Sequence, residues 1–428
     1  MRSLRYRWLL LPLVILLTAA CGHQGVARLG DAAATTTSAV APAAGLAYVR
    51  DGALWVTSVL NEHPRQLIGA NVSGWPRWSP SGAWLSVCVG EQLHLLSADG
   101  SSERTLGRCG GRWMPRGDTL IYRDDAGVIR QLSLGDGQER VLPEEGDAWS
   151  EDGATMLVVR QQQLGTRDAA NAPQRAVSLW RQSVDDSSAV EIFSPGNPAP
   201  YGLRVAGWYG DTILFWPVPG FSQSLLADGT SLQAISASGG TLRTLIPAML
   251  AREDFLARAP NGRLAVVDGA DRQTWTSKRI AVIDPASGAR MDVTPPDMAA
   301  VGPAWSPDGQ LLAYVTAPDR GPLGGGGAAR KALAERRIWT VRADGTEAQP
   351  LTHDAAERDE HPRWTADGQW IIFVRLDEQD RVSLWRVRPD GRDLMQIADQ
   401  LGTGASSDVP HWFGFYGAVD WAQLVDVR

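Results

Sequence analysis

The densest group of chemistry-bearing side chains in the sequence comprises His353, Asp354, Asp359, Glu360 and His361. Imidazole and carboxylate groups are ligands that zinc takes in proteins, usually four to a closed site. Two histidines eight positions apart in one loop are weak evidence for such a site, because the remaining ligands would have to come from another element. We therefore interpret the group as a solvated loop and predict no metal site and no cofactor.

Motifs for nucleophilic catalysis and phosphate binding are missing from the sequence. It contains no Gly-x-Ser-x-Gly nucleophile elbow, no phosphate-binding loop and no Cys-x-x-Cys pair. Its formal net charge is -7, and an acidic chain binds the nucleic-acid backbone poorly. We expect a protein that has no catalytic residues, is not an enzyme and binds no nucleic acid. A lyase or hydrolase remains an alternative.

Arginine recurs at one repeated position, directly before a tryptophan or its equivalent. These residues are Arg77, Arg112, Arg258 and Arg363. If the repeated segments are the inner strands of a ring, the four side chains would form a cationic channel mouth for a small anion or sugar. The alternative, which we favour, is that they stack on tryptophan rings between neighbouring segments.

The N-terminal segment has the organisation of an export signal. Three arginines precede an apolar run from Trp8 to Leu17, and small residues follow up to Cys21. The last five residues of this stretch resemble the bacterial lipobox, which implies removal of residues 1–20 and acylation of Cys21 with palmitate-type chains. The mature charge would then be near -7 - 3 = -10. Ordinary secretion with an incidental cysteine is the alternative.

The export signal also bears on the other cysteines and on the segment that follows. Residues 21–44 are rich in Ala, Thr and Ser without an apolar period, so we expect a flexible tether. Two cysteines remain, Cys88 and Cys109, and an even number in an oxidising compartment favours a disulfide between them. Two separate buried thiols are the alternative.

A repeat must position all of these groups. Its clearest copies are PRWSPSGAWLSV from Pro76, PAWSPDGQLLAYV from Pro303 and PRWTADGQWIIFV from Pro362. Each copy is followed by two further short apolar runs separated by turn residues, and Asp-Gly pairs suit tight hairpins. Each unit is therefore predicted to be four antiparallel strands. A single such sheet cannot bury both faces, so the units must stack with the tryptophans between them.

The chain ends predict how the stack closes. Leu46–Val56 has the pattern of a second and third strand without a first, and Val419–Ala422 that of a first strand alone. Pairing of these terminal strands would complete one blade and remove exposed edges. We predict an all-β fold in which residues 45–428 form a single propeller of eight blades, with seven as the alternative.

The Trp-Ser-Pro-Asp-Gly units and Ala-Asp-Gly-Thr turns resemble the TolB-like β-propeller repeat, over about residues 45–425. The resemblance is specific for the fold and weak for function. Propellers of this kind serve as periplasmic scaffolds that bind other envelope proteins, as the gating half of prolyl-oligopeptidase-type enzymes, and as some polysaccharide lyases.

Long insertions fall on one side of the predicted blades, between second and third strands or between fourth and first strands. Function concentrates on long loops of a rigid scaffold, so we expect this side to bind a partner. Its candidate contact residues are aromatic: Trp216, Phe221, Trp275, Trp412 and Phe413. The alternative is that these side chains pack the loops onto the blades. A short helix is also expected over residues 328–337.

These observations lead to one preferred function and one principal alternative. We expect a monomeric, non-catalytic propeller that is exported, anchored to the membrane through its N-terminal lipid, and bound to another envelope protein or a cell-wall component. The alternative is a sensor that binds a small anion or sugar at the channel mouth.

Overall fold

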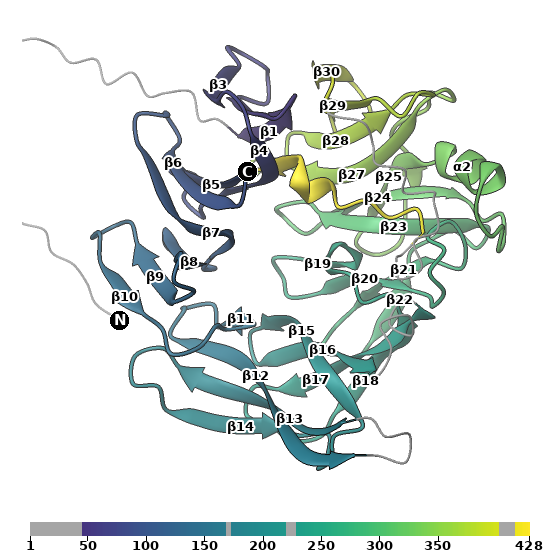
Figure 1. Ribbon diagram of the computed structural model, residues 1–428. Coiled ribbons are helices and arrows are strands. Elements are labelled where there is room, and N and C mark those ends of the chain that lie inside the picture. Colours follow the sequence, from purple (N-terminus) through teal and green to yellow (C-terminus); the bar gives the residue numbers. More distant parts are fainter. Residues whose placement is uncertain (1–44, 168–172, 220–227, 402–415) are drawn as a thin grey trace, which may run out of the picture. The chain divides into compact units, whose positions relative to one another are not determined.

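The computed structural model describes residues 45–167, 173–219, 228–401 and 416–428. The signal segment, the tether and Cys21 lie outside these residues, and the predictions for them stay predictions. The described residues form antiparallel sheets in which strands consecutive in sequence are neighbours (Figure 1). No helix among them is long and apolar enough to cross a membrane.

Seven sheets form within the described residues. The first contains β1 (Leu46–Arg50), β2 (Ala53–Thr57), β3 (Arg65–Ile68) and β31 (Val425–Val427). The second has seven strands: β4 (Val72–Trp78), β5 (Trp84–Val89), β6 (Gln92–Ser97), β7 (Glu103–Trp113), β8 (Thr119–Arg123), β9 (Ile129–Ser133) and β10 (Glu139–Val141).

Five four-stranded sheets follow along the chain. Two are β11 (Ala148–Trp149), β12 (Thr155–Arg167), β13 (Pro173–Ser183), β14 (Ala189–Phe193), and β15 (Tyr201–Tyr209), β16 (Thr212–Pro219), β17 (Thr230–Ser236), β18 (Arg243–Met249). The third is β19 (Leu256–Arg258), β20 (Leu264–Asp268), β21 (Arg279–Ile283), β22 (Arg290–Asp292). The last two are β23 (Met298–Trp305), β24 (Leu311–Pro318), β25 (Arg337–Arg342), β26 (Gln349–Pro350), and β27 (Arg358–Trp364), β28 (Ile371–Leu376), β29 (Val382–Val387), β30 (Met395–Ala398).

The repeated Ser-Pro-Asp-Gly sequence makes the turn between the first two strands of a unit. The hydroxyl of Ser306 donates to Oδ1 of Asp308 at 2.6 Å, and the same oxygen accepts from the N–H of Gln310 at 3.0 Å. The hydrogen bond from Ser306 and that from the backbone N–H lower the pKa of Asp308. Gly309 has a φ of 67°, a conformation that glycine adopts without strain. The sequence thus specifies the hairpin locally.

The strand β7 is longer than its neighbours because it serves two units. Its N-terminal half pairs with β6, and its C-terminal half, which ends at Trp113, pairs with β8. One continuous strand therefore joins two four-stranded units into the seven-stranded sheet.

The terminal strands pair as expected, but with different residues. β1 pairs with β31 in the register Leu46↔Val427 and Tyr48↔Val425. The segment around Trp421, predicted as the closing strand, is instead a 3₁₀ turn, η2 (Trp421–Gln423). This turn buries the Trp421 ring in a cluster with strands β1, β28 and β29, so the pairing strand begins only after it.

Tryptophans at the ends of the first strands join neighbouring sheets. Trp305 is 8% exposed, and its indole N–H donates to the carbonyl of Ala257 in β19 at 3.2 Å. The indole of Trp364 donates to the carbonyl of Ala304 at 3.0 Å, and that of Trp113 to the carbonyl of Arg77 at 3.1 Å. Each ring packs between two neighbouring units and satisfies its N–H on the preceding first strand. For Trp305 and Trp364 these units are separate sheets, whereas for Trp113 they are the two halves of the seven-stranded sheet.

Candidate functional site

The prediction of an exposed partner face is wrong for two of its five residues, Trp216 and Trp275, because both are buried. Trp216 is fully buried in β16, with the Arg204 guanidinium 5.5 Å from its ring, and Trp275 is 1% exposed. Trp275 packs against Ala329 and Leu333 of the short helix α2 (Gly327–Ala334), which confirms the expected helix. Both rings are packed inside the fold, because large apolar surfaces gain most from leaving water. Phe221, Trp412 and Phe413 lie outside the described residues.

A large cavity lies instead among the first strands. One part has a volume of about 1150 Å³ and a second part about 850 Å³. The two parts adjoin, since Trp75, Arg77, Arg204 and Asp426 line both. We call their union the central cavity.

The four predicted channel arginines have different surroundings. Arg112 lies 5.9 Å from the ring centre of Trp149 and donates to the carbonyl of Asp147 at 2.6 Å. Arg258 lies 5.3 Å from the ring of Tyr209 and pairs with Glu151 at 2.6 Å. Arg112 therefore lies over a tryptophan ring, as the favoured alternative states, whereas the ring beside Arg258 is a tyrosine.

Arg77 and Arg363 differ from the other two. Each donates through Nη1 to the carbonyl of the preceding proline, at 2.8 and 3.0 Å, and Arg77 also donates to the carbonyl of Ala422. Within the described ranges, no carboxylate oxygen forms an ion pair with either guanidinium inside 4.0 Å. Both line the central cavity.

A backbone bulge sets the position of the side chains before these arginines. The register of β4 shifts between Gly74 and Arg77, and that of β27 between Glu360 and Arg363. The bulges contain Trp75 and His361, whose φ angles are 54° and 57°. A positive φ is strained in such residues and costs on the order of 1–3 kcal/mol, and a bulge redirects its side chain.

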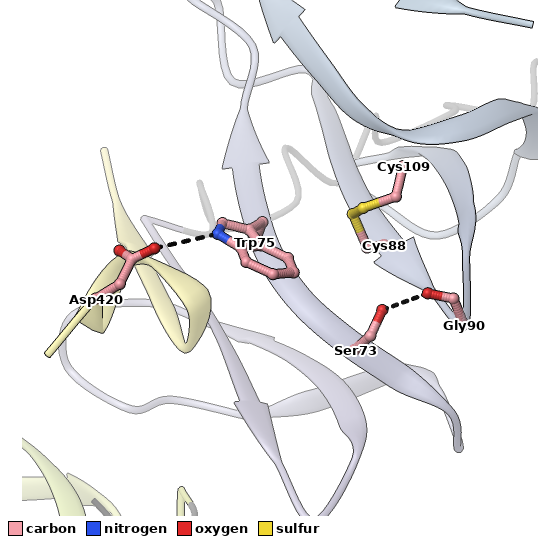
Figure 2. Close-up of a disulfide and its surroundings, with 6 residues drawn as sticks. All are labelled: Ser73, Trp75, Cys88, Gly90, Cys109 and Asp420. Atoms are coloured by element: carbon pink, nitrogen blue, oxygen red, sulfur yellow. Dashed lines mark hydrogen bonds between the residues drawn. A yellow bond between two sulfur atoms is a disulfide. The ribbon is translucent and has the colours of Figure 1, made fainter. Parts of the chain in front are cut away.

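The redirected side chains line the central cavity. The Trp75 side chain is 39% exposed, although it is among the largest apolar groups, and its indole N–H donates to Oδ2 of Asp420 at 3.3 Å. Figure 2 shows the ring extending from β4 toward Asp420. His361 lines the second part of the cavity together with Arg363.

The electrostatics of this region depend on Asp426 in β31. Its Oδ2 accepts the backbone N–H of Trp78 at 2.8 Å. Burial raises the pKa of Asp426, while that N–H, Arg77 and Arg363 act in the opposite direction. Burial, followed by repulsion from Arg363 and Arg77, lowers the pKa of His361 well below its ordinary value, so the imidazole is neutral at physiological pH.

The predicted solvated loop is correct for His353 and Asp354, which are exposed, and wrong for the residues that follow. Asp359 and Glu360 are buried in β27, at 0% and 5% exposure. Asp359 accepts two hydrogen bonds from Arg375, at 2.7 and 3.0 Å, and Glu360 pairs with Arg336 at 2.7 Å. Buried carboxylates need such partners, and Arg336, directly before β25, and Arg375 in β28 supply them. Arg358 in β27 also pairs with Glu360. No group of metal-ligating side chains occurs in the part of the chain that the structure describes.

The predicted disulfide between Cys88 and Cys109 is confirmed. It links β5 to β7, with β6 between them, and both cysteines line the larger part of the cavity (Figure 2). Cys88 also pairs in register with Gly74, the residue before the bulge at Trp75. The disulfide therefore braces the strands beside this bulge.

Sequence reasoning identified the arginines of the site and missed its other members. Trp75 lies directly before the repeat copy that starts at Pro76, and Asp426 lies after the segment predicted as the closing strand. The shared pattern Trp75-Pro-Arg-Trp and His361-Pro-Arg-Trp was a visible signal.

Comparisons with known proteins bear on the fold. No family model matches the chain, and no curated protein matches it. The chain resembles the solved structure of dipeptidyl peptidase 4 from Porphyromonas gingivalis, with 11% identity, a TM-score of 0.52, and coverage of 85% of this chain and 60% of that one. It also resembles putative TolB from Agrobacterium tumefaciens, with 15% identity, a TM-score of 0.37, and coverage of 83% and 89%.

A third similar structure is an oligogalacturonate lyase in complex with manganese, at 14% identity and a TM-score of 0.47, covering 79% of this chain and 94% of that one. The repeated four-stranded sheets agree with the expected β-propeller fold, and the likeness to the peptidase, at a TM-score of 0.52, supports that fold. Such low identities show the fold alone.

Proposed function

We propose that this chain is a non-catalytic binding propeller of the cell envelope. In this proposal it is exported, anchored through acylated Cys21 and the tether of residues 21–44, and bound to another envelope protein or a cell-wall component. Its ring has eight blades, closed where β31 completes the sheet of β1 to β3. The eight units counted along the described sheets support that number, since β7 belongs to two of them.

The observation that carries this proposal is the placement of Trp75. An indole held at a positive φ and 39% exposed, beside a guanidinium without an ion-pair partner, is costly to the folded chain. Strain of this kind persists where it serves binding, and tryptophan and arginine are the side chains that dominate binding energy at protein surfaces. The central cavity therefore supports a binding role better than the predicted loop face, where two aromatic residues are buried.

The test is capture of the partner from the native envelope. The full-length acylated chain is crosslinked in its own membrane and recovered, alongside a Trp75→Ala variant and a matched control, Val141→Ala. Val141 is 58% exposed in β10 and does not line the cavity. A partner recovered with the wild type and the control, and lost with Trp75→Ala, is the expected result. Equal recovery with all three chains, or turnover of a substrate by the purified chain, would contradict the proposal.

A second candidate function uses the same site. The two arginines without ion-pair partners favour a small anionic ligand, so the chain would act as a sensor for that ligand.

A further inference from the structure

Three neighbouring first strands present charged side chains at matching positions beside the central cavity. β27 carries Arg363, β31 carries Asp426 and β4 carries Arg77. β31 contacts β4 through the hydrogen bond between Asp426 and Trp78. The carboxylate of Asp426 lies near enough to both guanidinium groups to interact with them electrostatically.

The other carboxylates near these groups have their own partners. Asp254 accepts two hydrogen bonds from Arg252, at 2.8 and 2.6 Å, and Glu253 lies 3.8 Å from Arg204. Asp420 accepts the indole N–H of Trp75. Within the described ranges, neither Asp420 nor Asp426 forms an ion pair with Arg77 or Arg363 inside 4.0 Å. Both guanidinium groups therefore lack a carboxylate in direct contact, and an anionic ligand would supply one.

The two guanidinium groups lie next to a flat aromatic surface. Trp75 is two residues from Arg77 and lines both parts of the cavity. The exposed face of an indole packs against the C–H face of a sugar ring, since both are weakly hydrated, and the guanidinium forks bind carboxylate or phosphate oxygens. The neutral imidazole of His361 can donate to or accept from sugar hydroxyls.

We propose that the central cavity binds a sugar that carries a carboxylate or a phosphate. The anionic group lies between Arg77 and Arg363, and the ring lies on Trp75. This inference rests on the proposed binding function and specifies its ligand. The inner bulge of β23 supports the assignment, because there the same backbone carries Gly302 and Ala304 and so presents neither a ring nor a charge.

The test is calorimetric titration of the full-length protein in detergent with glucuronate, glucose 6-phosphate and neutral glucose. We expect one or both charged sugars to bind at least about tenfold more tightly than glucose, since hydrogen bonds to charged groups are worth that much. Whichever charged sugar binds identifies the anionic group. Equal affinities for all three sugars, or heat from none of them, would overturn the proposal.

Variants then locate the binding. The double variant Arg77→Ala, Arg363→Ala is expected to lose at least about tenfold in affinity, with partial recovery in the double lysine variant, which keeps charge but not the fork. Trp75→Ala should weaken the binding of the charged sugar and leave the binding of inorganic phosphate unaffected. Arg342→Ala is the matched control, because this half-exposed arginine lies outside the cavity lining. Unchanged affinity in the double variant, with native thermal unfolding, refutes the site.

The outcome also separates this inference from the proposed function. If no sugar binds but Trp75→Ala still abolishes capture of an envelope partner, the ligand assignment fails and the binding propeller stands. If both measurements are negative, both proposals fail.

Discussion

The bulges of β4 and β23 share a backbone conformation but carry different side chains. Both precede a proline and end at a buried tryptophan, and both contain a residue with positive φ. In β23 that residue is Gly302, which tolerates the conformation, whereas in β4 it is Trp75, which does not. The comparison separates two roles. The tryptophan that ends each strand packs between units in both cases, whereas the ring and the arginine of the β4 bulge are not needed for that packing and are available to bind a ligand.

The bulge of β27 adds a third case, with His361 and Arg363, and it is braced differently from that of β4. A disulfide lies beside the β4 bulge, and buried ion pairs of Asp359 and Glu360 lie beside the β27 bulge. Two different devices thus hold the two strained segments in place.

The largest expected effect is on stability, and it tests the structural role of the tryptophan at the end of the first strand. Trp305→Ala removes a ring that is 8% exposed and a hydrogen bond between sheets, so the free energy of unfolding should fall by about 4 kcal/mol. Trp75→Ala should cost far less, because its ring is partly in water. Denaturant titration of both variants measures the difference, and similar losses would show that Trp75 is structural too.

The next largest effect concerns the buried ion pairs beside the β27 bulge. Glu360→Gln leaves Arg336 and Arg358 buried without a counter-charge, and unfolding free energy should fall by about 3 kcal/mol. The exposed pair of Arg392 and Asp390 supplies a control, since Asp390→Asn should change stability by less than about 1 kcal/mol. A loss no larger than that of the control would mean that the buried pairs contribute no stability.

Glu360 also gives stability a dependence on pH. Burial would raise its pKa, but Arg336 and Arg358 hold it below the ordinary 4.5. A carboxyl group with a lowered pKa stabilises the fold above its unfolded pKa and loses this contribution as pH falls through the folded value. Thermal unfolding between pH 7 and pH 3 should therefore show a loss on the acid side that is smaller in Glu360→Gln. Parallel curves for the two chains would contradict this assignment.

The disulfide beside the β4 bulge is expected to contribute slightly less to the free energy of unfolding. The disulfide closes a loop between cysteines 21 positions apart, so replacing both with serine should lower unfolding free energy by about 2–3 kcal/mol. A reducing agent should destabilise the wild type and leave the double-serine variant unchanged. The same response to reductant in both proteins would show that the bond does not form in solution.

The smallest effect isolates the bulge itself. At position 75, glycine relieves the positive φ and alanine does not, so Trp75→Gly should be more stable than Trp75→Ala by about 1 kcal/mol. Both should lose ligand binding equally. If alanine is the more stable of the two, the backbone at this position relaxes when the ring is removed, and the strain argument is wrong.

The sequence predicts those parts of the molecule that short segments determine. Ser306, Asp308 and Gly309 form their turn through contacts two or three residues apart, so the repeat and its hairpins were predictable. The joining of two units through β7 was not, since nothing near Arg108 differs from an ordinary strand end. Trp216 and Trp275 were placed on the surface because only distant partners, such as Leu333 for Trp275, show that they are buried.

The residues of the central cavity were likewise predictable only where the repeat determines them. Arg77 and Arg363 follow from the repeat, whereas the ion pair between Glu360 and Arg336 and the neighbourhood of Asp426 depend on strands that meet only in the folded chain. The repeat indicated that these positions recur, but it carried no information on which of the four arginines already stack on rings.

The hydrogen bond from the Trp113 indole to the carbonyl of Arg77 gives the cavity an optical reporter. The acceptor belongs to the residue whose side chain is proposed to bind the ligand, while the donor ring belongs to the adjoining unit. Any movement of the Arg77 backbone changes the hydrogen bonding of this half-buried indole, and with it the emission wavelength of that fluorophore. Occupancy of the cavity should then be readable from intrinsic fluorescence without a label.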